Sequence, residues 1–255
     1  MADLMAIVWQ ETRDGIVYQV RNAGSTLRLY TDNVLHSQFN PNKKLTSSVW
    51  DLLFLPALCH PQKKPLRILV LGVGGGAVIK MLNEFVDCEK IIGIELNPTH
   101  IEIAQRFFSL SAANIQLIQA DALAWVEQQG STLKSSDKFD IIIDDLFYEE
   151  DKEPIKLAVP NATWFYNLYS LLKPNGVIVM NFVGRHSAMT AAPLYDDYVA
   201  KLLPNTLHLT TPHYDNHVLA FSKKNINSKT MNEKIQQHKE LKHLQQHLRF
   251  SCRSL

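Results

Sequence analysis

The chain has 255 residues, of which 46% are hydrophobic and 20% are charged, and its formal net charge at pH 7 is +1. This length and composition are typical of one globular α/β domain with additions, and the small net charge argues against a dedicated nucleic-acid-binding protein. The first residues lack the basic lead and apolar core of a signal peptide, and no run approaches the roughly 20 apolar residues of a membrane span.

Short alternating segments separated by turn residues occupy the first 40 residues. The predicted strands span residues 6–11, 16–21 and 26–31. Turns are predicted around Asp14-Gly15 and Ala23-Gly24, where glycine follows a small or polar residue. We therefore expect a small antiparallel sheet within residues 1–45, followed by an apolar helix over residues 47–58.

From residue 67 onward, predicted strands and helices alternate. The strands are predicted over residues 68–73, 91–94, 115–120, 139–146 and 177–183, with an antiparallel closing pair over 206–211 and 217–222. The helices are predicted over residues 77–85, 97–108, 122–129, 163–172 and 187–203, the last of them interrupted by Pro193. This alternation indicates a mostly parallel, doubly wound, Rossmann-like α/β sheet with a C-terminal antiparallel hairpin, and we assign it to residues 46–224.

The C-terminal segment, residues 225–255, differs from the rest in charge. Residues 223–255 contain eight Lys or Arg and two Glu, a net charge of +6, whereas the preceding 222 residues carry −5. Five apolar residues can share one stripe of a helix, namely Met231, Ile235, Leu241, Leu244 and Leu248. We expect a solvated basic helix docked loosely on its own domain, with an arm for a partner or an acidic ligand as the alternative.

A glycine turn follows the first core strand, and an acid ends the second. Gly72, Gly74 and Gly76 form a G-x-G-x-G turn, and Glu95 lies 19 residues beyond the last of them. Glycine lets the backbone bend sharply and approach a ligand, and the next helix offers unpaired N–H groups. A carboxylate at the end of the second strand can accept hydrogen bonds from ribose hydroxyls. The segment therefore predicts a nucleoside-binding unit.

Acids also follow the third and fourth strands, at Asp121 and at Asp144-Asp145. Ligands of open α/β sheets bind beyond the carboxyl ends of the strands, so these side chains are expected to surround one site. The G-x-G-x-G spacing departs from the G-x-G-x-x-G of dinucleotide sites, and the closing antiparallel pair is foreign to a plain dinucleotide fold. The pattern predicts a nucleoside cofactor other than NAD.

These motifs resemble those of the class I S-adenosylmethionine-dependent methyltransferases, and within them the spermidine synthase family. The resemblance runs from about residue 14 to residue 222 and includes LGVGGGA, IIGIEL, QADA and FDIIIDD. It implies S-adenosylmethionine or its decarboxylated form as cofactor, and a homodimer. The residues that it implies for the cofactor are Glu95 at the ribose, Asp121 and Ala122 at the adenine edge, and Gly72, Gly74, Gly75 and Gly76 at the methionine-like arm.

Three family carboxylates around an aminopropyl donor and a polyamine are absent or altered in this chain. The Asp of the family's glycine turn corresponds to Gly75, the second acid of its D-S-S-D-P loop to Tyr148, and its acidic D-E-x-x-Y stretch to the segment around Lys43 and Lys44. An acid at position 75 would repel the carboxylate of ordinary S-adenosylmethionine, and Gly75 removes that repulsion. We therefore expect methyl transfer to a small-molecule acceptor.

Two other functions stay open at this stage. The acids Glu149, Glu150, Asp151 and Glu153 follow the fourth strand and could attract a cationic acceptor, which favours aminopropyl transfer from decarboxylated S-adenosylmethionine. A solvated acidic loop is the alternative for the same run. The third possibility is a non-catalytic, nucleoside-binding interaction module that acts through its basic tail.

Both transfers are in-line displacements at a sulfonium carbon, to which positioning contributes most. A base is needed where the nucleophile is a protonated amine or a hydroxyl. Asp145 is the predicted base and Asp144 the second candidate, but neighbouring strand residues point to opposite faces, so only one should face the pocket. Tyr148 either orients the acceptor molecule or packs against other side chains of the protein.

No metal site is predicted. Cys59, Cys88 and Cys252 contain no C-x-x-C pair, and the spacing of the histidines at 208, 213 and 217 matches no zinc motif. Three widely spaced cysteines are also typical of a protein of the reducing cytoplasm, where we expect this chain to be located.

Overall fold

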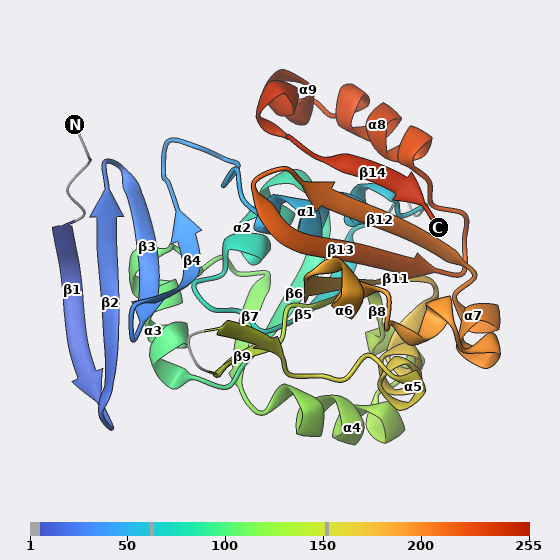
Figure 1. Cartoon of the computed structure of the whole chain (residues 1–255), viewed down its shortest axis with the longest axis horizontal. Helices are drawn as coiled ribbons and strands as arrows, with labels where there is room; N and C mark the ends of the chain where they lie inside the picture. The colour runs from blue at the N-terminus through green and yellow to red at the C-terminus, as the bar shows by residue number, and fades with distance from the viewer. Residues whose placement is uncertain (1–5, 62–63, 151–152) are drawn as a thin grey trace.

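The computed structural model describes residues 6–61, 64–150 and 153–255, and its largest element is a sheet with helices on both faces (Figure 1). Three sheets are present in these residues: an N-terminal sheet of four strands, a ribbon of two, and a main sheet of eight. The N-terminal sheet lies at one end of the molecule and the C-terminal elements lie toward the other in Figure 1. The architecture confirms the predicted doubly wound α/β fold preceded by a small antiparallel sheet.

The N-terminal sheet is an antiparallel meander of four strands, not three. Its strands are β1 (Ala6–Arg13), β2 (Ile16–Ala23), β3 (Thr26–Thr31) and β4 (Val34–Phe39). The prediction missed β4, which follows a two-residue turn at Asp32-Asn33 with φ angles of 46° and 70°. Positive φ at both central residues defines the type I′ hairpin turn, and Asn and Asp adopt it more readily than most side chains.

The main sheet has the order β14-β12-β13-β11-β8-β5-β6-β7. Its strands are β5 (Leu66–Leu71), β6 (Cys88–Glu95), β7 (Ile115–Gln119), β8 (Phe139–Asp144), β11 (Leu172–Val183), β12 (Asn205–Thr211), β13 (Tyr214–Ser222) and β14 (Ser251–Ser254). The five strands from β11 to β7 run parallel, and β13, β12 and β14 each pair antiparallel with the preceding strand of the sheet. The chain leaves β5 toward β6 and β7 and returns to β8 on its other side, so the strand order reverses between β5 and β8.

Helices cover both faces of this sheet. They are α1 (Trp50–Phe54), α2 (Ala77–Phe85), α3 (Pro98–Phe107), α4 (Ala122–Thr132), α5 (Ala162–Ser170), α6 (Arg185–Ala188), α7 (Asp197–Leu202), α8 (Ser228–Gln237) and α9 (Leu241–Leu244), with 3₁₀ turns η1 (Leu55–Cys59), η2 (Ser135–Asp137), η3 (Ala192–Leu194) and η4 (Gln245–His247). One apolar cluster packs α1, α2, α3, α8 and the N-terminal sheet on one face, and a second packs α4, α5 and α7 on the other. The helix predicted over 187–203 with an interruption at Pro193 consists of three short pieces, and Pro193 is the second residue of the 3₁₀ turn η3 in the middle.

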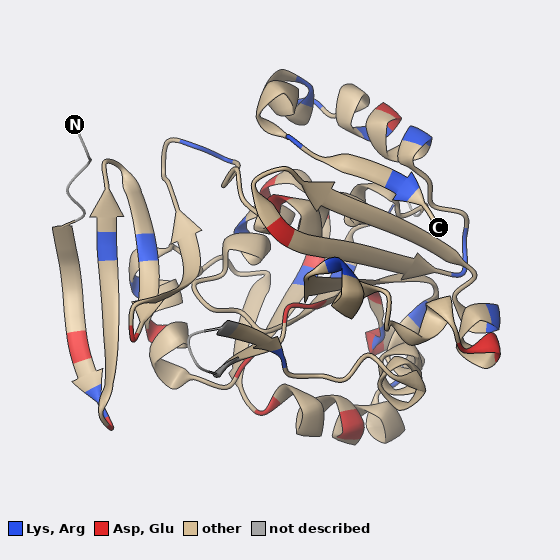
Figure 2. Cartoon of the chain, in the orientation of Figure 1, with Lys and Arg blue, Asp and Glu red and all other residues tan. Residues whose placement is uncertain are grey.

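The C-terminal segment is integrated into the fold, which corrects the prediction of a loosely docked helix. Met231, Ile235 and Leu241 are fully buried, and β14 pairs antiparallel with β12 at the edge of the main sheet. Figure 2 shows Lys and Arg residues distributed over α8, α9 and β14, and the Lys and Arg residues of these three elements are exposed. Each buried apolar side chain of this size contributes about 1.5–3 kcal/mol, which holds the segment in place.

A short antiparallel ribbon, β9 (Phe147–Glu150) with β10 (Glu153–Lys156), replaces the loop expected over residues 147–160. It follows β8 directly and lies beside the carboxyl ends of the parallel strands. The predicted acidic run falls largely outside what the structure describes, since Asp151 is not described and neither are the side chains of Glu149, Glu150 and Glu153.

Candidate functional site

A cavity of about 500 Å³ lies beyond the carboxyl ends of β5, β6, β8 and β11, where the strand order reverses. This is the position at which open α/β sheets bind ligands. The cavity brings together most of the predicted site residues: Gly72, Gly74, Glu95, Asp121, Ala122, Asp145 and Tyr148. Three predicted residues are not on its wall, namely Gly75, Gly76 and Asp144.

Glu95 ends β6 and is tied to the glycine turn that follows β5. Its Oε2 accepts hydrogen bonds from the backbone N–H of Val73 (3.0 Å) and Gly74 (2.9 Å), and its Oε1 accepts one from the N–H of Asn97 (2.9 Å). Burial alone would raise the pKa of Glu95, but His100 and the backbone N–H groups outweigh it and hold the pKa below its usual value. A carboxylate has about four acceptor positions, so about one is left for a ligand hydroxyl rather than the two expected.

The turn requires glycine at two positions because of close backbone contacts. Gly72 has φ +83°, and a Cβ there would lie 2.5 Å from the carbonyl oxygen of Asp145. Gly74 has φ +54°, and a Cβ there would lie 2.9 Å from the carbonyl oxygen of His36. Both residues line the cavity, so the bare backbone forms part of its wall.

Gly75 and Gly76 serve packing instead of lining the cavity, which corrects their predicted placement. A Cβ at Gly75 would lie 2.3 Å from the ring of Phe108, and one at Gly76 would lie 2.2 Å from the side chain of Leu110. Both neighbours are buried in the core. A side chain at position 75 would therefore meet Phe108 before it could face a ligand in the cavity, and the charge argument for Gly75 loses its geometric basis.

Asp121 and Ala122 lie at the start of α4, after β7. Asp121 Oδ1 accepts hydrogen bonds from the N–H groups of Leu123 (2.8 Å) and Ala124 (3.1 Å), which is the N-cap arrangement. Ala122 is buried and also borders the cavity. Among the described residues, Asp121 Oδ2 makes no hydrogen bond and is available as an acceptor at the rim.

Asp145 follows β8 and faces the cavity, as the first candidate for a base should. Its Oδ1 accepts a hydrogen bond from Asn181 Nδ2 (2.8 Å), and Asn181 Oδ1 accepts one from Asn216 Nδ2 (3.1 Å). Burial raises the pKa of Asp145, partly opposed by Asn181 and Lys156. A carboxylate with a raised pKa that is fixed by a neighbouring amide is suited to accept a proton.

Asp144 faces the opposite side of the strand and is a structural acid. It is fully buried, with Oδ1 2.6 Å from Lys156 Nζ and Oδ2 accepting a 2.8 Å hydrogen bond from Trp164 Nε1. Its Oδ1 also accepts the N–H of Leu146 (3.2 Å) and so closes the turn after β8. The prediction of Asp144 as the second candidate for the base is therefore wrong, because an acceptor molecule in the cavity cannot reach its carboxylate.

Several wall residues were missed. Asn181 interrupts an otherwise apolar buried strand, which is a signal that could have identified it. His36 lies on β4 and also lines the cavity, and its buried Nε2 has no hydrogen-bond partner in the described part of the chain. Burial, with a smaller contribution from His100, lowers the pKa of His36 to about 4, so the ring is neutral at pH 7. Tyr148, on β9, is 43% exposed at the cavity wall.

The described residues contain neither a cluster of metal-ligating side chains nor a helix that could span a membrane. No three His, Cys, Asp or Glu side chains approach one another there as the ligands of a metal ion would. None of the helices in those residues combines the length and the apolar character of a membrane-spanning segment.

Comparison with known proteins connects this fold to two kinds of transferase. Residues 62–247 match the family described as "Methyltransferase domain". The chain is 27% identical over 147 residues to the eEF1A lysine and N-terminal methyltransferase of Danio rerio, covering 55% of this chain and 20% of that protein. It is 30% identical over 134 residues to the polyamine aminopropyltransferase of Vibrio vulnificus, covering 52% of this chain and 41% of that protein.

A solved structure shares the fold over nearly the whole chain. It is a spermidine synthase in complex with the transition-state analogue AdoDATO, with a TM-score of 0.66 and 17% identity, covering 92% of this chain and 78% of that one. At this identity the likeness establishes the fold alone. The chain spans about a fifth of the length of the first curated relative above and about two fifths of the second.

Proposed function

The chain belongs to the methyltransferase-domain family, and from that premise we propose that it is an S-adenosylmethionine-dependent enzyme that methylates a small amine. The observation that supports this most strongly is the shared cavity, in which Glu95 and the bare Gly72–Gly74 backbone lie together with Asp145. Glu95 and the Gly72–Gly74 backbone are suited to bind a nucleoside, and Asp145 is suited to take up a proton from the acceptor molecule. A cavity of about 500 Å³ is also of the size that small-molecule sites have.

The residues fit the adenosine half of such a donor. Glu95 keeps about one free acceptor position for a ribose hydroxyl, and Asp121 keeps Oδ2 for a polar edge of the base. Ile94, Leu96 and Leu146 supply apolar wall that suits an aromatic ring. When bound, S-adenosylmethionine supplies a methyl group on a cationic sulfur.

This chain's residues then act on the acceptor. Asp145, whose pKa is raised by burial, accepts the proton of an ammonium group and leaves the nitrogen lone pair free to attack. Asn181, which is itself held by Asn216, keeps the Asp145 carboxylate in one orientation. Trp50 and Tyr148 border the same space and reduce access of water to it.

Aminopropyl transfer is the second candidate, favoured by the polyamine aminopropyltransferase among the relatives and by the spermidine synthase fold. Three carboxylates, Glu95, Asp121 and Asp145, line the cavity among the described residues, and the first two are assigned above to the nucleoside. A diamine acceptor carries two cationic groups that both need negative partners, whereas a monoamine carries one and matches the single remaining carboxylate. Methyl transfer therefore fits the described wall better.

The test is a calorimetric titration with three nucleosides: S-adenosylmethionine, its decarboxylated form and methylthioadenosine. We expect S-adenosylmethionine to bind with a dissociation constant in the micromolar range and mass spectrometry to show methylated products from a panel of primary amines. Binding of the decarboxylated donor alone, with aminopropylated products, would establish the second candidate. If none of the three binds, the proposed cofactor is wrong.

A further inference from the structure

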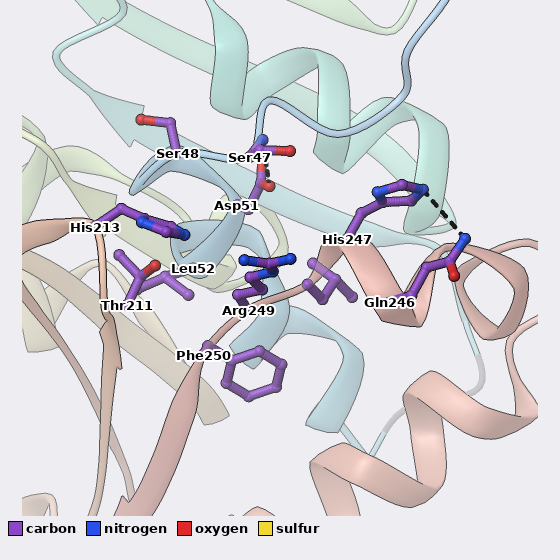
Figure 3. Close-up of a pocket in the computed structure, with 11 residues that line it drawn as sticks. Ser47, Ser48, Asp51, Leu52, Thr211, His213, Gln246, His247, Arg249 and Phe250 are labelled. Atoms are coloured by element: carbon purple, nitrogen blue, oxygen red, sulfur yellow. Dashed lines mark hydrogen bonds between the residues drawn. The ribbon is translucent and has the colours of Figure 1, made fainter.

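A second cavity, of about 260 Å³, lies where three segments distant in sequence meet (Figure 3). The first segment is the turn and first residues of α1, from Ser47 to Leu52. The second is the turn between β12 and β13, with Thr211 and His213. The third is the chain between η4 and β14, which includes Arg249. None of the residues that line this cavity was assigned a role in the proposed reaction.

The cavity is lined mainly by hydrogen-bond donors. Figure 3 shows the Arg249 guanidinium at the centre of the lining residues, with the His213 ring on one side and the His247 ring on the other. Within the described chain, the side chains of Arg249 and His213 form no hydrogen bond or ion pair. The hydroxyls of Ser48 and Thr211 lie on the same wall. Arg249 therefore brings to this cavity a positive charge that forms no ion pair among the described residues.

One acid, Asp51, is among the lining residues, and its oxygens are already used. Oδ1 accepts hydrogen bonds from the N–H (2.8 Å) and the hydroxyl of Thr46, and Oδ2 accepts one from the N–H of Ser47 (2.8 Å). Burial raises the pKa of Asp51, partly opposed by the hydrogen bonds from Thr46 and Ser47. The carboxylate is bound to its own turn and does not form the counter-ion of Arg249.

The C-terminal segment that lines part of this cavity is also positively charged. Residues 223–255 carry a net charge of +6, and this segment contributes His247 and Arg249 to the cavity. A guanidinium offers a planar pair of N–H donors that matches a phosphate or carboxylate, and a nearby imidazole and hydroxyls satisfy the remaining oxygens. Of these anions, phosphate has the more oxygens, and three kinds of donor group converge here.

We propose that this cavity binds the phosphate group of a small molecule. It is next to the candidate active site, because Val49 and Trp50 of the same short segment line the larger cavity whereas Ser48 and Asp51 line this one. The phosphate site does not depend on the proposed methyl transfer, since it can be occupied with the larger cavity empty. It therefore has its own test, carried out without any nucleoside.

The test follows the backbone amide resonances of the whole chain by NMR as inorganic phosphate is added at constant ionic strength, with chloride as the balancing anion. We expect saturable shifts within residues 47–52, 211–213 and 246–250. Arg249→Gln should weaken the phosphate affinity by about tenfold or more, because a charge-assisted pair of hydrogen bonds is lost. Lys242→Gln is the matched control, because this variant loses the same charge at an exposed residue of α9 that does not line the cavity. Its affinity for phosphate should stay within about twofold of the wild-type affinity.

Three results would overturn the proposal. Phosphate could produce no saturable shift beyond that of chloride, or shifts confined to the Gly72–Gly74 turn. The two variants could lose affinity equally, which would indicate general attraction to a basic surface. His213→Ala, which removes a second hydrogen-bond donor, should also weaken binding, and unchanged thermal unfolding of each variant separates loss of the site from loss of the fold.

Discussion

The Glu95 carboxylate accepts a 2.9 Å hydrogen bond from the backbone N–H of Gly74, so the acid that ends one strand fixes the turn that follows its neighbour. The same oxygen accepts the N–H of Val73, and the other accepts the N–H of Asn97. Hydrogen bonds to an ionised acceptor are stronger than neutral ones, so this arrangement is rigid. The nucleoside end of the cavity is therefore organised before any ligand enters.

Position 75 should respond to side-chain size and not to charge. Gly75→Ala and Gly75→Asp should both lower the free energy of unfolding by about 1–3 kcal/mol, because either Cβ meets the buried Phe108 ring. Urea unfolding measures this, and donor titration of both variants compares their affinities. Gly130→Ala in α4 is the control, since its added methyl meets only the Ser170 hydroxyl. A variant series in which Gly75→Asp alone loses affinity would restore the charge explanation.

Asp145 should be required for turnover but not for donor binding. Asp145→Asn removes the proton acceptor and keeps the shape, so kcat should fall by about 10²-fold or more, while the donor affinity changes little. Steady-state kinetics with a methylated-product assay and calorimetry measure the two effects separately. If the variant turns over normally on a protonated amine, Asp145 is not the base.

Asp144 should be required for stability. Asp144→Asn leaves the buried Lys156 ammonium without its anionic partner and weakens the contact with Trp164, so unfolding free energy should fall by about 3 kcal/mol. The neighbouring Asp145→Asn variant serves as the control and should lose less. An Asp144→Asn protein of normal stability that cannot turn over would exchange the roles assigned to the two acids.

Low pH should destabilise the protein through His36. The unfolded chain takes up a proton near pH 6.5, whereas burial keeps the folded-state pKa of His36 at about 4. The neutral His36 ring therefore makes its full contribution to the free energy of unfolding above pH 6.5. This contribution is lost as pH falls toward 4, and the loss reaches about 2 kcal/mol at pH 5. Thermal unfolding of wild type and His36→Gln across this range measures it, and the variant should show a shallower pH dependence. His243→Gln, an exposed control, should retain the wild-type slope.

The sequence was sufficient for the parts of the site that depend on strand order. Gly72, Glu95 and Asp121 follow successive strand ends, and parallel strands bring such ends to one edge. It was not sufficient for side-chain direction: Gly75 is in the same turn as Gly74 but packs on Phe108, and only tertiary contacts determine that.

Two further misses have identifiable physical causes. His36 was missed because no strand was predicted after the Asp32-Asn33 turn, so β4 was absent from the expected sheet. β14 was missed because its residues, SCRS, show no alternation of apolar and polar side chains, and its strand conformation comes from pairing with β12. The choice between Asp144 and Asp145 depended on which face of β8 meets the cavity, which periodicity alone cannot determine.

The most direct test of the account is calorimetric titration of S-adenosylmethionine into wild type and Glu95→Gln. The amide keeps the volume of the carboxylate but has one acceptor oxygen, so it cannot hold all three backbone N–H groups and a ribose hydroxyl. We predict that the affinity falls by about tenfold or more, while Glu127→Gln, an exposed acid of α4, binds as wild type does. Equal affinity of wild type and Glu95→Gln would contradict the assignment of this cavity to an adenosine-containing donor.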